Sequence, residues 1–364
     1  FSISMMDDPL LSTVTDGLST EEGTVVNNTP IEYKIAAILF RYYAIVLLII
    51  GLFGNTMTFI VFSRKGMKGS VTSFLFRMLA VADNFVCLVT NIPEVMLELA
   101  GTSAAYATDP QCKVHGYIFF AGKTYAVWAL LLIVLERFIG ITFPHKASSL
   151  ITFKRAKMSV GILFIIIYAL YAPLLFVMSA TEIYDTFGNI INYYCEVSST
   201  NLPYFVLKFF PWFDLLMYCV IPFILMIIAN ICIIYKLVLS SRMRQETTRD
   251  SSQSDVRGTT IMLLGISFGF IICTGPYCVS SYIYTVYGTS SPKHYLFGAF
   301  ASVLVNMNHC INFYIYCLTG TRFRREVRKM FGCHEPNNTT LSTVRTGVTS
   351  RSDTVSAKAC TVGT

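Results

Sequence analysis

Residues 112–138 decide the fold, and they read CKVHGYIFFAGKTYAVWALLLIVLERF. The stretch begins with a cysteine, continues as an almost uninterrupted apolar run, and ends on the charged pair Glu136 and Arg137. Arg137 lies 25 positions after Cys112, and a helix of that length covers roughly 37 Å, which is enough to cross about 30 Å of hydrocarbon. We therefore expect a membrane-spanning helix with one end in an oxidising exterior and the other in a reducing interior.

The whole chain has the composition of a membrane protein. Of its 364 residues, 54% are hydrophobic and only 13% are charged, whereas soluble domains carry about 25% charged residues. Seven apolar segments of spanning length follow one another at about 36–62, 71–99, 112–141, 155–178, 209–239, 258–286 and 295–318. We predict an all-α membrane protein with a seven-transmembrane helix bundle over residues 36–318.

Lysine and arginine concentrate in alternate connections and after the last span. These residues are Arg64, Lys65 and Lys68, then Lys146, Lys154, Arg155 and Lys157, then Arg242, Arg244 and Arg249, and finally Arg322, Arg324, Arg325, Arg328 and Lys329. The positive-inside rule places these segments in the cytoplasm, so the amino terminus is predicted to be extracellular and the carboxyl terminus cytoplasmic. The net charge of +7 then reflects topology and contact with anionic membrane lipid, and not binding to nucleic acid.

The two ends of the chain are polar. Residues 1–35 are predicted to form a disordered extracellular tail with one N-glycosylation acceptor, Asn27. Residues 319–332 carry apolar side chains at helical spacing between basic ones, which predicts a short amphipathic cytoplasmic helix. Cys333 is placed for palmitoylation, with an unmodified thiol as the alternative. Residues 333–364, rich in Ser and Thr, are predicted to be a disordered cytoplasmic tail.

The 11 cysteines fit this topology. Seven fall within the apolar spans: Cys87, Cys219, Cys232, Cys273, Cys278, Cys310 and Cys317. Cys333 and Cys360 are cytoplasmic, so Cys112 and Cys195 are the two expected at the exterior. A disulfide between these two would tie the top of the third span to the long loop before the fifth and fix that loop as a lid.

Ionisable and amide side chains inside the spans are candidates for function, because placing a polar or charged group in the membrane costs free energy. Asp83 lies in the middle of the second span, and Asn308, Asn312 and Tyr316 share one face of the seventh. This cluster would coordinate a small cation or hold a water network. A hydrogen-bonded network without an ion is the alternative.

The inner end of the third span carries Glu136 and Arg137. A half-buried arginine needs a carboxylate partner, and a pair that breaks in a conformational change acts as a switch. A snorkelling interface arginine is the alternative.

Charged groups also gather in the outer half of the spans. An outward-facing cavity of mixed charge suits a polar or zwitterionic ligand, whereas a structural Glu94–Lys123 pair is the competing interpretation. The candidate ligand pocket consists of Glu94, Glu98, Phe119, Lys123, Asp214 and Tyr277. Four spans are interrupted by prolines, which kink helices and provide hinges: Pro93, Pro173, Pro222 and Pro276.

In their order along the chain, these residues resemble the signature positions of the rhodopsin-like (class A) G-protein-coupled receptors. The resemblance rests on Gly54 and Asn55, residues 79–83, Cys112, residues 136–138, Cys195, Pro222, Pro276 and residues 312–316. The details are similar to the peptide-receptor branch, especially invertebrate FMRFamide-type receptors. The resemblance implies an extracellular peptide ligand, a heterotrimeric G protein, arrestin and a receptor kinase as partners, and no cofactor.

The resemblance also assigns roles to single residues. Arg137 would lock to its neighbours at rest and contact the G protein when the sixth helix moves outward, and Tyr316 would move towards Arg137. Asp83, Asn308 and Asn312 would line a sodium pocket.

The chain departs from the family pattern at several positions. Phe313 stands where a proline is expected, which predicts a straighter seventh helix. Thr274 replaces a tryptophan and leaves Phe270, near Pro276, as the packing switch for activation. Ala126 occupies a position that often supplies a sodium ligand. Phe119 replaces the aspartate of amine receptors, and the seventh span lacks a retinal-binding lysine, so both of those classes are disfavoured.

Two other functions stay open. A class A receptor for a non-peptide small molecule uses the same signatures. A transporter or channel would also carry intramembrane charges, although the chain shows no internal repeat. An enzyme is not predicted, because the five histidines are scattered and no nucleophile–base arrangement or metal-ligand spacing is evident.

Overall fold

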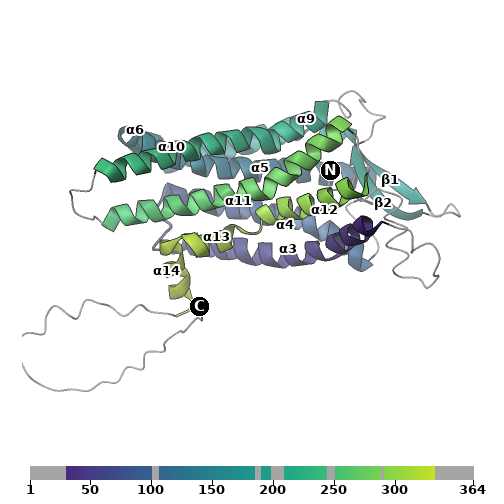
Figure 1. The fold of residues 1–364 in the computed structure, drawn as a ribbon, viewed down its shortest axis with the longest axis horizontal. Helices are drawn as coiled ribbons and strands as arrows, with labels where there is room; N and C mark the ends of the chain where they lie inside the picture. The colour runs from purple at the N-terminus through teal and green to yellow at the C-terminus, as the bar shows by residue number, and fades with distance from the viewer. Residues whose placement is uncertain are drawn as a thin grey trace, which may run out of the picture.

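The computed structural model describes residues 30–100, 106–184, 190–197, 209–243, 251–287 and 291–332. Long helices run side by side along the long axis of the molecule, with a β-hairpin at one end and helix α14 turned across the other (Figure 1). Within these residues, six helical spans are long and apolar enough to cross a membrane, and a bent helix pair makes a seventh. The predicted seven-transmembrane bundle is therefore confirmed.

The spans have the following bounds. The first three are α3 (Ile31–Ser63), α4 (Val71–Ala100) and α5 (Asp109–Thr142), and the short helix α6 (Pro144–Leu150) follows. The fourth is α7 (Phe153–Tyr171) with α8 (Leu174–Val177), the fifth is α9 (Phe210–Asp214), η3 (Leu215–Val220) and α10 (Ile221–Met243), and the sixth is α11 (Ser251–Tyr287). The seventh consists of α12 (Pro292–Asn308) and α13 (Asn312–Thr319).

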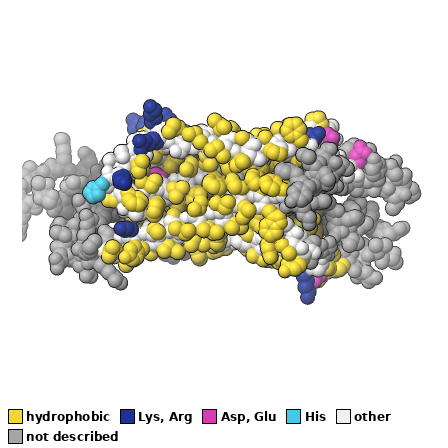
Figure 2. Space-filling model, turned by 90° about the horizontal axis from the view of Figure 1, so that it is seen from above, with side chains coloured by type: hydrophobic (Ala, Val, Ile, Leu, Met, Phe, Trp, Pro, Cys, Tyr) yellow, Lys and Arg dark blue, Asp and Glu magenta, His cyan; other side chains and the backbone are white. Residues whose placement is uncertain are grey.

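The outer surface of the bundle is apolar. A broad belt of hydrophobic side chains covers its middle, and most of the visible lysine and arginine lies at the end where α6 is found (Figure 2). Ile49 and Phe268 are 65% and 63% exposed, although both lie within long apolar helices. Side chains of this kind are stable only against lipid, so this belt is the membrane-facing surface.

Helix α5 is the axis of the fold. It packs against α4, α7, α8, α10 and the hairpin, and its buried side chains extend from Cys112 to Val134. Small residues allow this close packing. At Gly116, for example, a Cβ atom would lie 2.5 Å from the methyl carbon of Met178.

The loop before the fifth span is a β-hairpin of β1 (Met178–Tyr184) and β2 (Ile190–Val197). Ala180 pairs with Cys195, and Cys195 is bonded to Cys112 at a Cα–Cα distance of 5.4 Å. The carboxylate of Asp109, at the start of α5, accepts hydrogen bonds from the Ala180 amide at 2.8 Å and from the Ser179 hydroxyl at 3.1 Å. The hairpin is thus fixed to the amino-terminal end of α5 by a covalent bond and two hydrogen bonds.

A second disulfide joins Cys219 in η3 to Cys278 in α11, with a Cα–Cα distance of 6.4 Å. Both residues were predicted to lie within apolar spans, and this bond was not predicted, because only the cysteines expected outside the membrane were considered for pairing. Two helices of a bundle can bring buried cysteines together at any depth, and the pattern of one chain does not reveal which faces meet.

Two of the prolines coincide with breaks in the helices. Pro173 separates α7 from α8, and Pro222 follows the π-helical turn η3. Such turns leave carbonyl groups without a regular partner. One of them, the carbonyl of Met217, accepts a hydrogen bond from Trp128 Nε1 of α5 at 2.8 Å. Pro93 and Pro276 lie inside α4 and α11.

The seventh span is bent by 62° between α12 and α13, so the straighter helix predicted from Phe313 is wrong. Proline is one cause of a helix break, and competition for the backbone by side chains is another. Here the carbonyl of His309, at the break, accepts a hydrogen bond from Asn55 Nδ2 of α3 at 2.9 Å. A neighbouring helix therefore supplies the hydrogen bond that stabilises the bend.

Helix α14 (Thr321–Met330) is the short helix predicted after the seventh span. Its Phe323 side chain is buried. Its Glu326 forms two ion pairs, with Oε2 3.3 Å from Arg64 Nε and Oε1 3.0 Å from Lys329 Nζ. Burial alone would raise the pKa of the Glu326 carboxyl, but the hydrogen bonds from Lys329 and Arg64 outweigh it and lower the pKa. Gly66 makes this approach possible, because a Cβ there would lie 2.8 Å from Glu326 Oε1.

Candidate functional site

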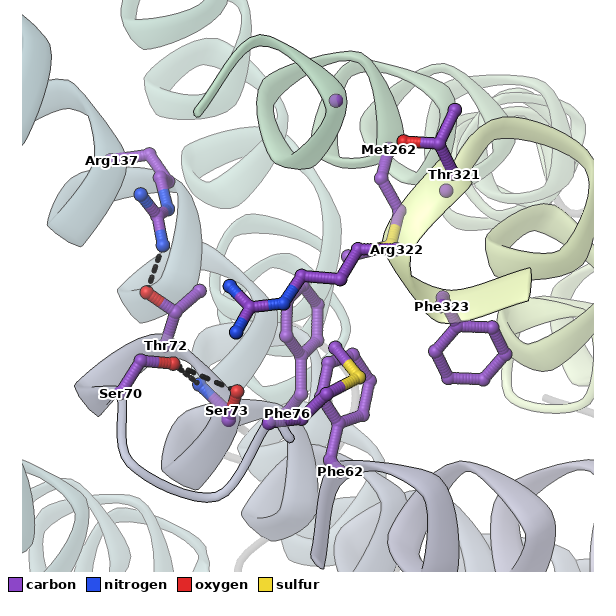
Figure 3. Close-up of a pocket in the computed structure, with 13 residues that line it drawn as sticks. Phe62, Ser70, Thr72, Ser73, Phe76, Arg137, Met262, Thr321, Arg322 and Phe323 are labelled. Carbon is purple, nitrogen blue, oxygen red and sulfur yellow. Dashed lines mark hydrogen bonds between the residues drawn. The ribbon is translucent and has the colours of Figure 1, made fainter. Parts of the chain in front are cut away.

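A cavity of about 130 Å³ opens at the end of the bundle where α14 lies. It is enclosed by α4, α5, α11 and the segment that begins α14. Its lining residues are Phe62, Met67, Ser70, Thr72, Ser73, Phe76, Arg137, Gly258, Met262, Gly320, Thr321, Arg322 and Phe323. Figure 3 shows Arg137 reaching into the cavity from α5 towards Thr72, with Arg322 extending from the opposite wall. The cavity thus presents two guanidinium groups to whatever enters it.

Arg137 is held by two partners. Its Nε lies 3.2 Å from Glu136 Oε2, and its Nη2 donates a hydrogen bond to the Thr72 hydroxyl. The same hydroxyl lies 3.1 and 3.2 Å from the two carboxylate oxygens of Glu136 and donates to them. The side chains of Glu136 and Arg137 are 11% and 20% exposed, so the pair is largely shielded from water. Thr72 is the bridge of this triad, and the sequence analysis did not identify it.

Tyr316 belongs to an aromatic cluster beside the cavity. Its ring lies 5.8 Å from Phe62, 5.2 Å from Phe76 and 5.4 Å from Phe323, measured between ring centroids. Among the described residues, no hydrogen bond links Tyr316 to Arg137. The structure therefore places the two expected switch residues at the same end of the bundle but in separate contacts.

Asp83 lies at the centre of the bundle, where its side chain is 2% exposed. Its Oδ1 is 2.8 Å from His309 Nδ1, and its Oδ2 accepts a hydrogen bond from Asn312 Nδ2 at 2.8 Å. Asn308 is also buried, but none of the hydrogen bonds in the described part of the chain joins it to Asp83. The structure brings together Asp83 and Asn312 of the predicted network and adds His309. That histidine is one residue after Asn308, and helical spacing could not find it because the helix breaks there.

The packing residues predicted in α11 are both in the core. Phe270 is fully buried in the main apolar cluster of the bundle, and Pro276 lies inside α11 one residue before Tyr277. Thr274 between them is also fully buried, and its hydroxyl has no hydrogen-bond partner in the described structure. The segment around Pro276 is therefore packed by apolar contacts.

Lys123 lies in an aromatic cage in the half of the bundle that carries the β-hairpin. Its Nζ lies 4.7 Å from the ring centre of Phe119, 4.9 Å from that of Tyr218 and 5.1 Å from that of Tyr277. The residue is 5% exposed, and no carboxylate of the described side chains forms an ion pair with it. The Glu94–Lys123 pair considered above is therefore absent from this part of the chain. Three ring faces stabilise the ammonium group instead.

Asp214 interacts electrostatically with Lys123. Its Oδ1 accepts a hydrogen bond from the Tyr171 hydroxyl at 2.8 Å, and that hydroxyl accepts one from Thr124 at 2.9 Å. The chain of hydrogen bonds connects α5, α7 and α9. Glu94 is buried in α4. Lys123 and Asp214 together place opposite charges in one region of the bundle.

Three predicted positions fall outside what the structure describes. These are the side chain of Glu98, the glycosylation acceptor Asn27 and the palmitoylation candidate Cys333. Conversely, the cage residue Tyr218 was not predicted. It lies in the π-helical turn η3. A π-turn changes the faces on which the following residues lie, so a periodicity of about 3.6 residues does not predict them correctly.

The fold and these sites match a known family. The sequence fits the family model described as 7 transmembrane receptor (rhodopsin family) over residues 54–316, from the first span to the seventh. The chain therefore belongs to this family of G-protein-coupled receptors, and it is a multi-pass plasma-membrane protein. The family resemblance predicted from the sequence is confirmed.

Curated relatives are similar over most of the chain at low identity. The FMRFamide receptor of Drosophila melanogaster is 23% identical over 83% of this chain, which spans only 54% of that relative. The mesotocin receptor of Rhinella marina is 25% identical over 79% of this chain and 75% of the relative. The allatostatin-A receptor of Bombyx mori is 26% identical over 82% of this chain and 83% of the relative.

Proposed function

We propose that this receptor binds an extracellular peptide at the outer end of the bundle and activates a heterotrimeric G protein at the cavity around Arg137. The observation that carries the proposal is the arrangement along α5, which presents a caged cation near one end and a restrained arginine at the other. Three relatives named for peptides support the ligand class. The amino terminus is then extracellular and the carboxyl terminus cytoplasmic, in agreement with the basic residues of the inner connections.

The outer site provides complementary groups for a peptide. Lys123 is a buried cation without a carboxylate partner among the described side chains, so it would receive a carbonyl or carboxylate of the ligand. Glu94, Glu98 and Asp214 would receive a cationic group. The hairpin fixed by Cys112 would form the roof of this site. Binding is favourable because a ligand acceptor offsets the cost of burying the ammonium group.

The inner site would act as the switch. In the structure Arg137 is restrained by Glu136 and Thr72. An agonist shifts the equilibrium only if it binds the active bundle more tightly than the resting one. Movement of α11 about Pro276 would widen the cavity, and Arg137 would then leave its partners and contact the G protein. Tyr316 would move out of its aromatic cluster towards Arg137.

Other partners follow from the predicted cytoplasmic segments. We propose that arrestin and a receptor kinase act on residues 333–364, and that α14 lies on the membrane lipid with Cys333 palmitoylated. These contacts place the receptor under the usual control by phosphorylation.

A second candidate is a class A receptor for a non-peptide acid. Relatives named N-arachidonyl glycine receptor are 22% identical to this chain. A fatty acyl amino acid would place its carboxylate at Lys123 and its apolar chain among the aromatic rings. A transporter or channel is the candidate from another class, which intramembrane charges favour and which the family membership opposes.

One screen separates these candidates. Cells expressing the full chain are exposed to a neuropeptide library and to fatty acyl amino acids, with calcium and cyclic-nucleotide readouts, beside cells expressing Arg137→Ala. We expect a peptide to act on the intact chain and to bind the variant without signalling. A response to acyl amino acids alone would replace the peptide proposal with the second candidate. Ion flux in proteoliposomes without ligand would favour the channel.

A further inference from the structure

The polar centre around Asp83 has an arrangement that bears on sodium. Both oxygens of this carboxylate are already engaged at 2.8 Å, one by His309 Nδ1 and the other by Asn312 Nδ2. When this carboxylate is ionised it only accepts hydrogen bonds, and both partners then turn an N–H towards it. The positive ends of two N–H dipoles therefore point at the place where a metal cation would bind.

The groups in contact with the two Asp83 oxygens are not the ligands that a hard cation prefers. Such cations prefer carboxylate, carbonyl and water oxygens. His309 supplies a ring nitrogen, and Ala126, buried in α5, supplies a methyl group. The described structure gives Asp83 no hydrogen-bond partner besides His309 and Asn312. With both Asp83 oxygens engaged by these two side chains, the arrangement does not fit the ion.

His309 is held so that its ring cannot easily leave Asp83. Its carbonyl accepts the hydrogen bond from Asn55 Nδ2 at 2.9 Å, and its side chain is 2% exposed. It stands at the 62° bend between α12 and α13. One residue thus connects the seventh span to α3 through its backbone and to α4 through its ring. Removing the ring would open space beside Asp83 and free one carboxylate oxygen.

We infer that His309 is the resident partner of Asp83 in this receptor and that it takes the place of a sodium ion at the centre of the bundle. The inference does not depend on the identity of the extracellular ligand or on G-protein coupling. It predicts that sodium, added alone, neither binds to nor stabilises the folded receptor. It also predicts that a sodium site appears when His309 is replaced by a small oxygen-bearing residue.

The test uses purified full-length receptor in lipid nanodiscs without ligand. Thermal unfolding is followed in NaCl, KCl and choline chloride at equal ionic strength, and ²³Na line broadening is measured in parallel. For the native chain we expect the same Tm in all three salts. For His309→Ser we expect a sodium-specific rise of about 2–4 °C, the size expected for a ligand present at several times its Kd.

Asn308→Ser is the matched control, because it changes the neighbouring buried side chain and leaves the His309–Asp83 contact intact. We expect no sodium-specific rise for this variant. A sodium-specific rise in the native chain would overturn the inference, and so would a folded His309→Ser variant that gains none. If His309→Ser does not fold, the native chain still decides, because sodium-specific stabilisation or ²³Na broadening there contradicts the inference.

Discussion

Thr72→Val tests whether the bridge at the cytoplasmic cavity restrains Arg137. The threonine hydroxyl donates to Glu136 at 3.1 and 3.2 Å and accepts from Arg137. Valine keeps the shape of the side chain and removes the hydroxyl. A hydrogen bond to a charged group contributes about 1.5–3 kcal/mol, and we take about 1.5 kcal/mol because the arginine is 20% exposed and partly screened.

If the bridge is already broken in the active state, removing the Thr72 hydroxyl destabilises the resting state alone. A change of about 1.4 kcal/mol is tenfold in an equilibrium constant, so an active population of about 1% would rise to roughly 10%. The assay is agonist-free nucleotide exchange on purified G protein by receptor in nanodiscs. We expect about a tenfold faster basal rate for Thr72→Val and a native rate for Thr72→Ser, which keeps the hydroxyl. Equal basal rates for valine and serine at equal receptor concentration would refute the bridge as a restraint.

Four further substitutions probe the ligand site, the packing and the second disulfide. Lys123→Met keeps the length of the side chain and removes its charge, so we expect the potency of an activating peptide to fall at least about tenfold in a calcium or cyclic-nucleotide assay. An unchanged potency would remove Lys123 from the ligand site. Gly51→Ala should destabilise the receptor by about 1–3 kcal/mol, because its Cβ would lie 2.6 and 2.9 Å from two cysteine sulfurs. Gly161→Ala, which meets nothing within 4 Å, should be neutral or stabilising by up to about 1 kcal/mol. Cys219→Ser should remove one disulfide-linked peptide pair from a non-reducing mass map of the receptor, and the native map lacking a Cys219–Cys278 pair would contradict the bond.

The features that a local pattern specifies were predictable from the sequence. Spanning helices need only length and hydrophobicity, and the boundaries found agree within a few residues apart from two helix starts: α3 begins at Ile31 and not near 36, and α11 begins at Ser251 and not near 258. The positions of Asp83, Lys123 and Arg137 within their spans also follow from counting along a helix. A charged residue in an apolar run is visible without any knowledge of its neighbours.

The features that were not predicted depend on contacts between helices. His309 approaches Asp83 because the seventh span bends, and the bend is stabilised by Asn55 from a distant span. Similarly, Tyr218 enters the aromatic cage because η3 adds a residue to one turn of the fifth span. Periodicity assumes a regular helix, so every irregular turn moves the following side chains to faces that the pattern does not predict.

Lys123 and Arg137 form two polar levels along α5, and the apolar packing between them bears on how a signal can travel. Lys123 and Arg137 are 14 residues apart, which is roughly 21 Å along a helix. Between them, Leu131 and Ile133 of α5 and Phe270 of α11 are almost fully buried in one apolar cluster. A hydrogen-bonded relay cannot pass through side chains that have no polar atoms. Along this face of α5, coupling between the outer and inner sites is therefore carried by shifts of packed helices, for which Pro276 provides a break in the ladder of α11.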